Sequence, residues 1–288
     1  MLDHTTIAFL GAGSMAEAMI SGIVNKGVVP NQKIFATNRK NKERLKELEM
    51  NYGIKGIHQE NIPFDQIDIF VLAMKPKDVG NALSSLKNSI KPNQLILSVL
   101  AGVTTSFIEA QLHEGQQVVR VMPNTSSMVG ESATAISPGT YTTAKNVHIS
   151  ERLLQSIGEV YTIEESKMDI FTGLAGSGPA YFYYLMEHME QAGFKAGLDE
   201  KTTRSIIAQT VMGAAKMVLE KEEKPEELRI KVTSPNGTTA AGLDALNQNG
   251  GGYAIAQAVL SAAKRSSEIS EQFETSEHED VKEEVVNK

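Results

Sequence analysis

The sequence contains no cysteine, which excludes disulfide bonds and thiolate chemistry. None of its apolar runs approaches the roughly 18 residues that a membrane-spanning helix needs. The N-terminus also lacks the basic stretch and long apolar core of a signal peptide. We therefore expect a cytoplasmic protein.

Other absences narrow the chemistry further. The six histidines are scattered, and no two have the spacing of metal ligands, so no metal site is predicted. The sequence has no G-x-S-x-G nucleophile turn and no Gly-Lys-Ser/Thr phosphate loop. The net charge is −7, and because the residues from Ser266 onward hold eight acids and two bases, the rest of the chain is close to neutral. That balance lacks the basic patch that a nucleic-acid partner requires.

A glycine-rich turn near the N-terminus carries the strongest positive signal. Gly11-Ala12-Gly13-Ser14-Met15-Ala16 follows the apolar run 6–10 and precedes a helix-like stretch. In a dinucleotide-binding unit the first glycine permits the sharp turn, the second allows close approach of a pyrophosphate, and a small third residue lets helix pack on strand. The free N–H groups of the helix then face the phosphates. The alternative is a purely structural turn.

The end of the second strand indicates which dinucleotide binds. Dinucleotide sites that select NAD place an Asp or Glu there to bind the ribose 2′-hydroxyl. This chain has no acid between Glu17 and Glu43, and its second strand, 33–36, continues into Thr37-Asn38-Arg39-Lys40. A guanidinium at Arg39 would attract a 2′-phosphate, so we predict NADPH over NADH. Arg39 and Lys40 as a solvated surface pair remain the alternative.

The order of elements predicts an α/β fold with two domains. Up to residue 164, apolar strands alternate with helix-like segments, which is typical of a Rossmann-like domain with a parallel sheet. The expected strands are 6–10, 33–36, 67–73, 95–99, 117–121 and 133–136, and the expected helices are 42–50, 77–89 and 104–112. Residues 165–272 have only helical periodicity, at 177–192, 200–219, 237–248 and 252–269. We therefore predict a dinucleotide-binding domain at 1–164, an all-helical domain at 165–272 and a disordered acidic tail at 273–288.

Several loops are candidate ligand sites. Ala73-Met74-Lys75-Pro76, Ala101-Gly102-Val103 and Met122-Pro123-Asn124-Thr125 each follow a predicted strand, where ligands bind in open α/β sheets. In the helical half, Val232–Ala240 gathers hydroxyl and N–H groups at a helix start without a carboxylate, which is the form of an anion cradle. An ordinary helix cap is the alternative for that segment. The glycine-rich segment 172–180 fits either a ligand or close helix packing, and the aromatic cluster 181–184 is interpreted as helix core.

Taken together, these motifs resemble those of the pyrroline-5-carboxylate reductase family, over nearly the whole chain to about Glu271. The most specific segments are Thr172-Gly173-Leu174-Ala175-Gly176-Ser177-Gly178-Pro179-Ala180-Tyr181 and Val232-Thr233-Ser234-Pro235-Asn236-Gly237-Thr238-Thr239-Ala240-Ala241-Gly242-Leu243. One departure is Asn236, where the family usually has a second glycine; asparagine also tolerates left-handed backbone.

The resemblance implies an enzyme of proline biosynthesis that transfers hydride from NADPH to a cyclic imine. It implies an intertwined homodimer, or a higher homo-oligomer such as a decamer, whose active site joins the dinucleotide domain of one subunit to helices of its partner. The implied cofactor contacts are Leu10, Gly11, Ala12, Gly13, Ser14, Met15, Asn38, Arg39, Asn61, Ala73, Met74, Lys75, Pro76, Ala101, Gly102 and Val103. The implied substrate contacts are Ser234, Asn236, Gly237, Thr238 and Thr239, and the side chains implied in catalysis are Thr239 and Lys75.

Three other functions are open to a chain of this kind. A 3-hydroxyacid dehydrogenase would need a lysine base on the first long helix of the second domain, but 173–194 contains no lysine. A reductase of another cyclic imine is poorly separated by sequence. A non-enzymatic NADPH-binding regulator would not need the cradle at 232–240.

Overall fold

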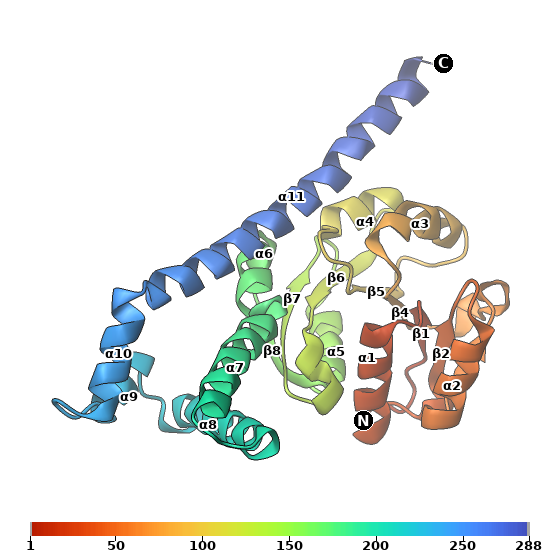
Figure 1. Cartoon of the computed structure of the whole chain (residues 1–288). Helices are drawn as coiled ribbons and strands as arrows, with labels where there is room; N and C mark the ends of the chain where they lie inside the picture. The colour runs from red at the N-terminus through yellow and green to blue at the C-terminus, as the bar shows by residue number, and fades with distance from the viewer. Residues whose placement is uncertain (1, 287–288) are drawn as a thin grey trace. The chain divides into compact units, whose positions relative to one another are not determined.

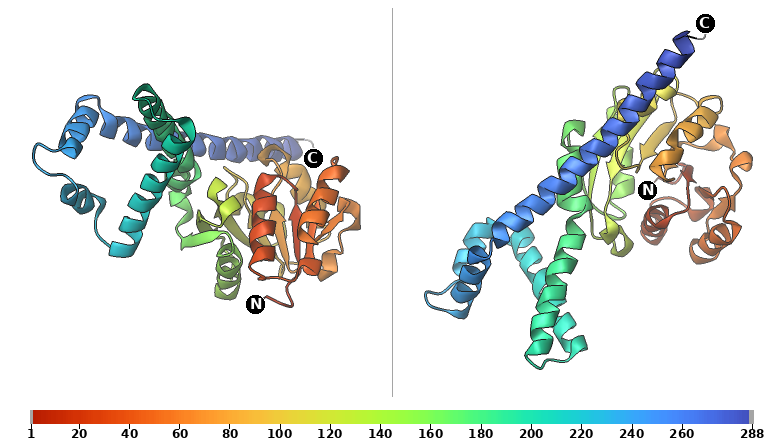
Figure 2. Two further views of the ribbon diagram at one scale, coloured as in Figure 1. Left: turned by 60° about the horizontal axis from the view of Figure 1, so that its bottom comes forward. Right: turned by 45° about the horizontal axis from the view of Figure 1, so that its top comes forward.

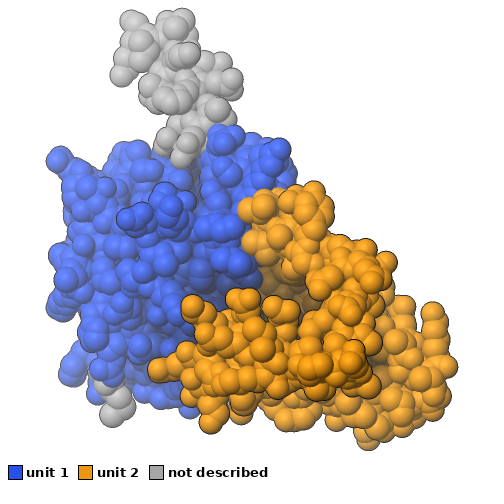
Figure 3. Space-filling model, turned by 90° about the vertical axis from the view of Figure 1, so that its left-hand side faces the viewer, with its two compact units in different colours: residues 1–176, 262–288 blue, residues 177–261 orange. Residues whose placement is uncertain are grey.

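The computed structural model describes residues 2–286, with side chains as far as Phe273. Two compact units emerge, one formed by Met1–Gly176 with Ala262–Lys288 and the other by Ser177–Ser261 (Figure 3). The predicted domain boundary between 164 and 165 falls inside the first unit and stays a prediction. The disorder predicted for 273–288 also stays a prediction. Beyond Phe273 the side chains lie outside the described part of the structure.

Over the described residues, unit 1 is built on an eight-stranded sheet in the order β3-β2-β1-β4-β5-β6-β7-β8 (Figure 1). The strands are β1 Ile7–Leu10, β2 Ile34–Thr37, β3 Lys55–Ile57, β4 Ile69–Leu72, β5 Leu95–Ser98, β6 Gln117–Met122, β7 Ser132–Pro138 and β8 Gly158–Thr162. All neighbours run parallel except β6 and β7, which are antiparallel. The predicted parallel sheet is confirmed from β3 to β6, and β7 and β8 extend it in the opposite direction.

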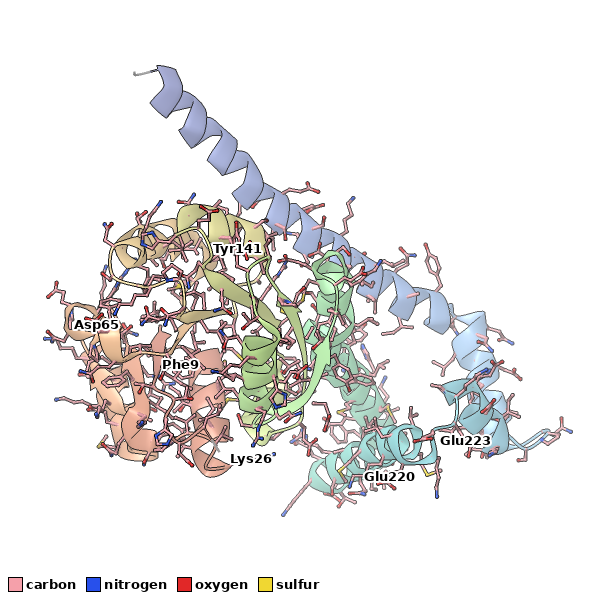
Figure 4. The ribbon with its side chains drawn as sticks, turned by 180° about the vertical axis from the view of Figure 1, so that it is seen from behind. Phe9, Lys26, Asp65, Tyr141, Glu220 and Glu223 are labelled. Carbon is pink, nitrogen blue, oxygen red and sulfur yellow. The ribbon has the colours of Figure 1, made fainter. Side chains whose placement is uncertain are left out.

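Helices cover both faces of this sheet because the strands are apolar on both sides. They are α1 Ser14–Asn25, α2 Lys42–Tyr52, α3 Val79–Lys87, α4 Thr105–Gln111 and α5 Ala144–Leu154. Alternate residues of β1 enter two cores: Phe9 packs with α1, α2 and α5, whereas Ala8 packs with α3 and α4. Phe9 is fully buried (Figure 4). This two-sided burial explains why apolar runs mark the central strands so clearly.

Both edge strands of the sheet, β3 and β8, escaped the sequence analysis. The residues of β3 are exposed or half-buried, and those of β8 are mostly exposed, so neither has the apolar run of a buried strand. Helix α5 was likewise not predicted. The helix expected at 77–89 begins with a separate 3₁₀ turn at Pro76–Asp78 before α3.

A buried ion pair ties the end of the sheet to the chain that follows it. Arg120 of β6 is almost fully buried and donates to Glu165 over 3.2 Å. Glu165 also accepts hydrogen bonds from the backbone and the hydroxyl of Thr105 at the start of α4. The chain continues through α6 Met168–Phe171 and a π-helical turn at Thr172–Gly176.

Helices make up all the regular secondary structure of unit 2 over its described residues (Figure 2). It contains α7 Gly178–Lys195, α8 Glu200–Lys221, α9 Pro225–Lys231, α10 Thr238–Gln248 and the first part of α11 Gly251–Val286. The charged segment 220–227 spans the end of α8, marked by Glu220 in Figure 4, and the start of α9. None of the described helices is long and apolar enough to cross a membrane.

Helices α7 and α8 meet where a glycine allows it. An added Cβ on Gly193 would lie 2.6 Å from the methyl group of Thr203, and Arg204 donates to Glu190 over 2.7 Å. The sequence analysis interpreted the cluster 181–184 as helix core, and this is wrong for the single chain. Phe182, Tyr183 and Tyr184 are each about half exposed or more. Helical periodicity predicts which face of a helix is apolar, but it does not predict whether the same chain covers that face.

Candidate cofactor and substrate sites

A cavity of about 760 Å³ lies at the carboxyl ends of β1, β2 and β4 in unit 1. Ligands bind at this edge in open α/β sheets, because the parallel strands all end there. Its lining includes the predicted cofactor residues Leu10, Gly11, Ala12, Gly13, Ser14, Met15, Asn38, Arg39, Ala73, Met74 and Lys75. Three strand ends far apart in sequence thus meet in one cavity.

The two glycines of the turn between β1 and α1 differ in their surroundings. Gly11 has φ +122°, and an added Cβ would come within 2.6 Å of the carbonyl carbon of Ala73, so the turn packs directly on the end of β4. At Gly13 no atom lies within 4 Å of an added Cβ, so the turn is open there. Gly11 therefore shapes the turn, and Gly13 keeps it accessible to a ligand.

The first turn of α1 presents unpaired N–H groups. Its cap residue, Gly13, has no side chain to accept from them, and the first helical hydrogen bond runs from the Glu17 N–H to the Gly13 carbonyl over 3.0 Å. The N–H groups of Ser14, Met15 and Ala16 precede that bond and are therefore left for a ligand or water. The positive end of the helix dipole adds to their attraction for an anion.

The end of β2 forms the second wall of the cavity. The Thr37 hydroxyl donates to the Phe9 carbonyl over 3.2 Å, and the Asn38 carboxamide oxygen accepts from the backbone N–H groups of Lys40 and Asn41. These bonds fix the loop from which the Arg39 side chain, 49% exposed, projects. The loop carries no carboxylate, as the sequence analysis noted.

Charged side chains around the cavity favour an anionic ligand. Among the described lining residues, the bases are Arg39, Lys40, Lys75 and Lys77, and the acid is Asp78. Asp78 pairs with Arg39 over 3.4 Å. This carboxylate was not foreseen, and it competes with a ligand phosphate for the guanidinium. The positive excess nevertheless suits a polyphosphate group.

Helix α2 contacts the glycine turn through Arg44, which sequence reasoning missed. The Arg44 Nε–H donates to the Ala12 carbonyl over 3.1 Å, and its two terminal nitrogens pair with Glu17 and Glu47. The hydrogen bond with Glu17 raises the pKa of the Arg44 guanidinium above its ordinary value. The Tyr52 hydroxyl also donates to Glu17, over 3.2 Å, and burial raises the pKa of Tyr52.

Some predicted cofactor residues lie away from the described lining of the cavity. Asn61 is exposed in a 3₁₀ turn, two residues after Gln59, which does line the cavity. Pro76 begins the turn before α3. Gly102 packs against α11, where an added Cβ would lie 2.5 Å from the Ile269 side chain, and it is buried with Val103, whereas Ala101 is exposed. The cavity instead includes Thr37, Lys40, Gln59, Lys77, Asp78 and Ala82.

The predicted substrate segment lies in unit 2 at the start of α10. Ser234 accepts from the Gly237 N–H over 3.0 Å in a tight turn, and Asn236 inside that turn has φ +59°. Glycine adopts this left-handed backbone without strain, and asparagine tolerates it better than most other residues. Asparagine therefore keeps the turn at this position.

Helix α10 begins as α1 does. Its cap is a glycine, Gly237, which offers no side-chain acceptor, and its first helical hydrogen bond runs from the Ala241 N–H to the Gly237 carbonyl over 3.2 Å. The N–H groups of Thr238 and Thr239 precede that bond, and both residues are exposed. By contrast, α8 is capped by Asp199, which accepts from the Thr202 N–H over 3.0 Å.

No group of three or more histidine, aspartate or glutamate side chains that could hold a metal ion occurs in the part of the chain that the structure describes.

The two halves of the chain match two family models. Residues 165–269 match "pyrroline-5-carboxylate reductase dimerisation" and residues 6–102 match "NADP oxidoreductase coenzyme F420-dependent". The chain is 62% identical over 274 residues to pyrroline-5-carboxylate reductase 1 of Bacillus subtilis, covering 95% of this chain and 92% of that protein. It is 45% identical to reductase 2 of the same organism, covering 93% and 96%. A crystal structure of the Plasmodium falciparum pyrroline carboxylate reductase with NADP bound superposes with a TM-score of 0.84 at 27% identity, covering 93% and 99%.

Proposed function

The chain belongs to the pyrroline-5-carboxylate reductase family, and on that premise we propose that it reduces 1-pyrroline-5-carboxylate to proline with NADPH. The observation that carries this proposal is the 62% identity to a named reductase over 95% of the chain. This is the function that the sequence motifs imply, including the glycine turn and the segment before α10.

The cavity in unit 1 suits NADPH for reasons internal to the chain. Its glycine turn is open at Gly13, its helix end offers unpaired N–H groups, and its lining is mostly basic. In the proposed complex, Ser14 and Met15 bind the pyrophosphate through their backbone, and Arg39 binds the 2′-phosphate. When bound, the reduced nicotinamide supplies the hydride that the imine carbon accepts.

The start of α10 suits the carboxylate of the substrate. We assign the N–H groups of Thr238 and Thr239, which follow Gly237 at the helix start, to that carboxylate and the Thr239 hydroxyl to orienting the ring near its nitrogen. Ser234 and Asn236 support the turn that aims these groups. Lys75 adds a positive charge to the cavity wall, where it attracts an anionic ligand.

Positioning accounts for most of the proposed catalysis. An imine that carries a proton on nitrogen is already electrophilic, so hydride addition at carbon needs no strong acid from the protein. Orienting two reactants can lower a barrier by about 7–11 kcal/mol at the upper end. Hydroxyls and backbone donors are then sufficient, and neither a histidine base nor a bound metal ion is required.

We also propose that the protein is a cytoplasmic homo-oligomer, a dimer or a larger ring such as a decamer. Residues 165–269 match the family's dimerisation model. Large apolar side chains of unit 2 are exposed in the single chain, which is unusual for a surface that stays in water. They include Phe182, Tyr183, Tyr184, Leu185, Leu219, Ile230, Tyr253 and Leu260.

A single assay tests the proposed reaction. Purified protein is mixed with NADPH and 1-pyrroline-5-carboxylate, and the loss of NADPH absorbance is followed while proline is measured as product. Parallel reactions contain a six-membered cyclic imine carboxylate, or no imine. Equal rates with both imines would assign the chain to another imine reductase, and NADPH binding without turnover would identify a regulator.

A further inference from the structure

Glu17 places a negative charge at the end of α1 that is expected to receive a pyrophosphate. It is the acid in the first turn of that helix, and its side chain is 17% exposed, so water screens it only in part. An acid in the first turn stabilises the helix through the dipole. It would also repel a phosphate group held by the N–H groups of the same turn.

Arg44 neutralises this carboxylate from the neighbouring helix. One terminal nitrogen of Arg44 pairs with Glu17, and the guanidinium is only 18% exposed. The second terminal nitrogen holds Glu47 over 2.7 Å, and Tyr52 donates to the other oxygen of Glu17. The Glu17 charge is thereby satisfied on the α2 side of the helix.

The same guanidinium fixes the orientation of the glycine turn. Its Nε–H donates to the Ala12 carbonyl over 3.1 Å. In a trans peptide the carbonyl and the following N–H point in opposite directions, so a fixed Ala12 carbonyl also fixes the direction of the Gly13 N–H. Gly13 is the cap of α1 and lines the cavity, whereas Arg44 does not.

Arg44 is itself held by the loop that forms the second wall. Asn41 caps α2 by accepting from the Arg44 N–H over 2.9 Å, and the Asn41 N–H donates to the Asn38 side chain over 3.0 Å. Asn38 lines the cavity beside Arg39. A short chain of hydrogen bonds thus joins both walls of the cavity.

We propose that Arg44 is a positioning residue for NADPH: it neutralises Glu17 and orients the Ala12–Gly13 peptide so that the turn accepts a pyrophosphate. The inference rests on the proposed function because it takes the cavity to be the cofactor site. Arg44 is not among the residues that line the cavity. Its effect therefore falls on the part of the cofactor that NADPH and NADH share.

The test compares Arg44→Met, Glu17→Gln and the double variant with the wild-type chain. Arg44→Met is expected to weaken the binding of both NADPH and NADH by about tenfold or more, because a charge-assisted bond is lost and a carboxylate is left unpaired. The turnover number should change by less than about twofold, which a KM-against-kcat comparison measures. Arg39→Gln is the matched control and should weaken NADPH alone.

The double variant separates charge from packing. Removing the carboxylate as well should restore part of the lost affinity, because the bond to the Ala12 carbonyl stays absent, and Glu17→Gln alone should bind NADPH at least as tightly as wild type. Arg44→Lys keeps the charge but loses the planar fork, so it should lie between wild type and Arg44→Met. Direct nucleotide binding and thermal unfolding are measured for each variant.

The outcomes are distinct. Wild-type affinity in Arg44→Met, a double variant no better than Arg44→Met, or weaker binding by Glu17→Gln would each overturn the inference. Should Arg44→Met fail to fold, Glu17→Gln and Arg44→Lys still decide. Wild-type protein that binds no NADPH would instead refute the proposed function.

Discussion

Replacing Arg39 by glutamine should reduce the preference for NADPH over NADH without affecting the reaction with NADH. Arg39 lines the cavity at the end of β2, where no carboxylate is available to bind a ribose 2′-hydroxyl. Its guanidinium lies 3.4 Å from Asp78, which is the acid of the cavity lining. Asp78→Asn should therefore act in the opposite direction, because it removes a competitor for Arg39.

The magnitude follows from the environment of the Arg39–Asp78 pair. At 3.4 Å, two unit charges interact by about 1.2 kcal/mol in bulk water and by about 5 kcal/mol at an effective dielectric constant of 20. The two side chains are 49% and 34% exposed, so the lower end applies to a phosphate in the same place. We expect Arg39→Gln to cost about 1–2 kcal/mol of NADPH binding, which is about a 5- to 30-fold rise in KM.

The assay compares kcat/KM with NADPH and with NADH for wild type, Arg39→Gln and Asp78→Asn at low and high salt. The change in NADPH preference should shrink as salt screens the charges. If Arg39→Gln changes both cofactors equally, or neither, Arg39 does not read the 2′-phosphate, and the reasoning from the end of β2 is wrong.

Variants at three further positions test other parts of the structure. Thr239→Ala should raise the barrier measured by kcat/KM by about 1–3 kcal/mol, because one hydrogen bond is lost, whereas Thr239→Ser should retain most activity. Steady-state kinetics measures both variants, and an unchanged kcat/KM in Thr239→Ala would show that the hydroxyl has no role. Gly11→Ala should abolish NADPH binding, because the added methyl group overlaps the Ala73 carbonyl; nucleotide titration checks this, and normal affinity would contradict it. The hydrogen bond from Thr202 lowers the pKa of Asp199, so the stability that this cap adds is present at neutral pH and is lost as the pH falls through the lowered pKa. Asp199→Ala should therefore lower the melting temperature more at pH 7 than at acid pH, whereas Asp199→Asn should not show this difference between the two pH values. Equal losses for Asp199→Ala at both pH values would refute the role of Asp199 as a cap.

Local features of the fold and site could be predicted from sequence. The glycine turn, the strand before it and the helix after it lie within one stretch of chain. The two glycines and the small residue after them therefore predict the turn without reference to distant parts of the chain. Arg39 could be placed because it directly follows a buried strand. The glycine cap of α10 was predictable for the same reason.

Features that depend on distant partners could not be predicted. The Arg44–Ala12 hydrogen bond joins residues 32 positions apart, and no pattern within either segment marks it. Strand β7 runs antiparallel to β6, and the direction of a strand follows from the path of the chain between the two strands rather than from its own composition. Ala101–Val103 follow a strand as expected, but Gly102 is covered by Ile269 from the far end of the chain.

The bare glycine starts of α1 and α10 make this protein sensitive to the salts around it. In a helix with a side-chain cap, the protein itself accepts hydrogen bonds from the first N–H groups, whereas in these two helices that role is left to water or a bound anion. Sulfate or inorganic phosphate should bind such ends, raise the melting temperature by mass action and compete with cofactor and substrate alike. The choice of buffer anion would then affect both the thermal stability of the purified protein and its measured activity.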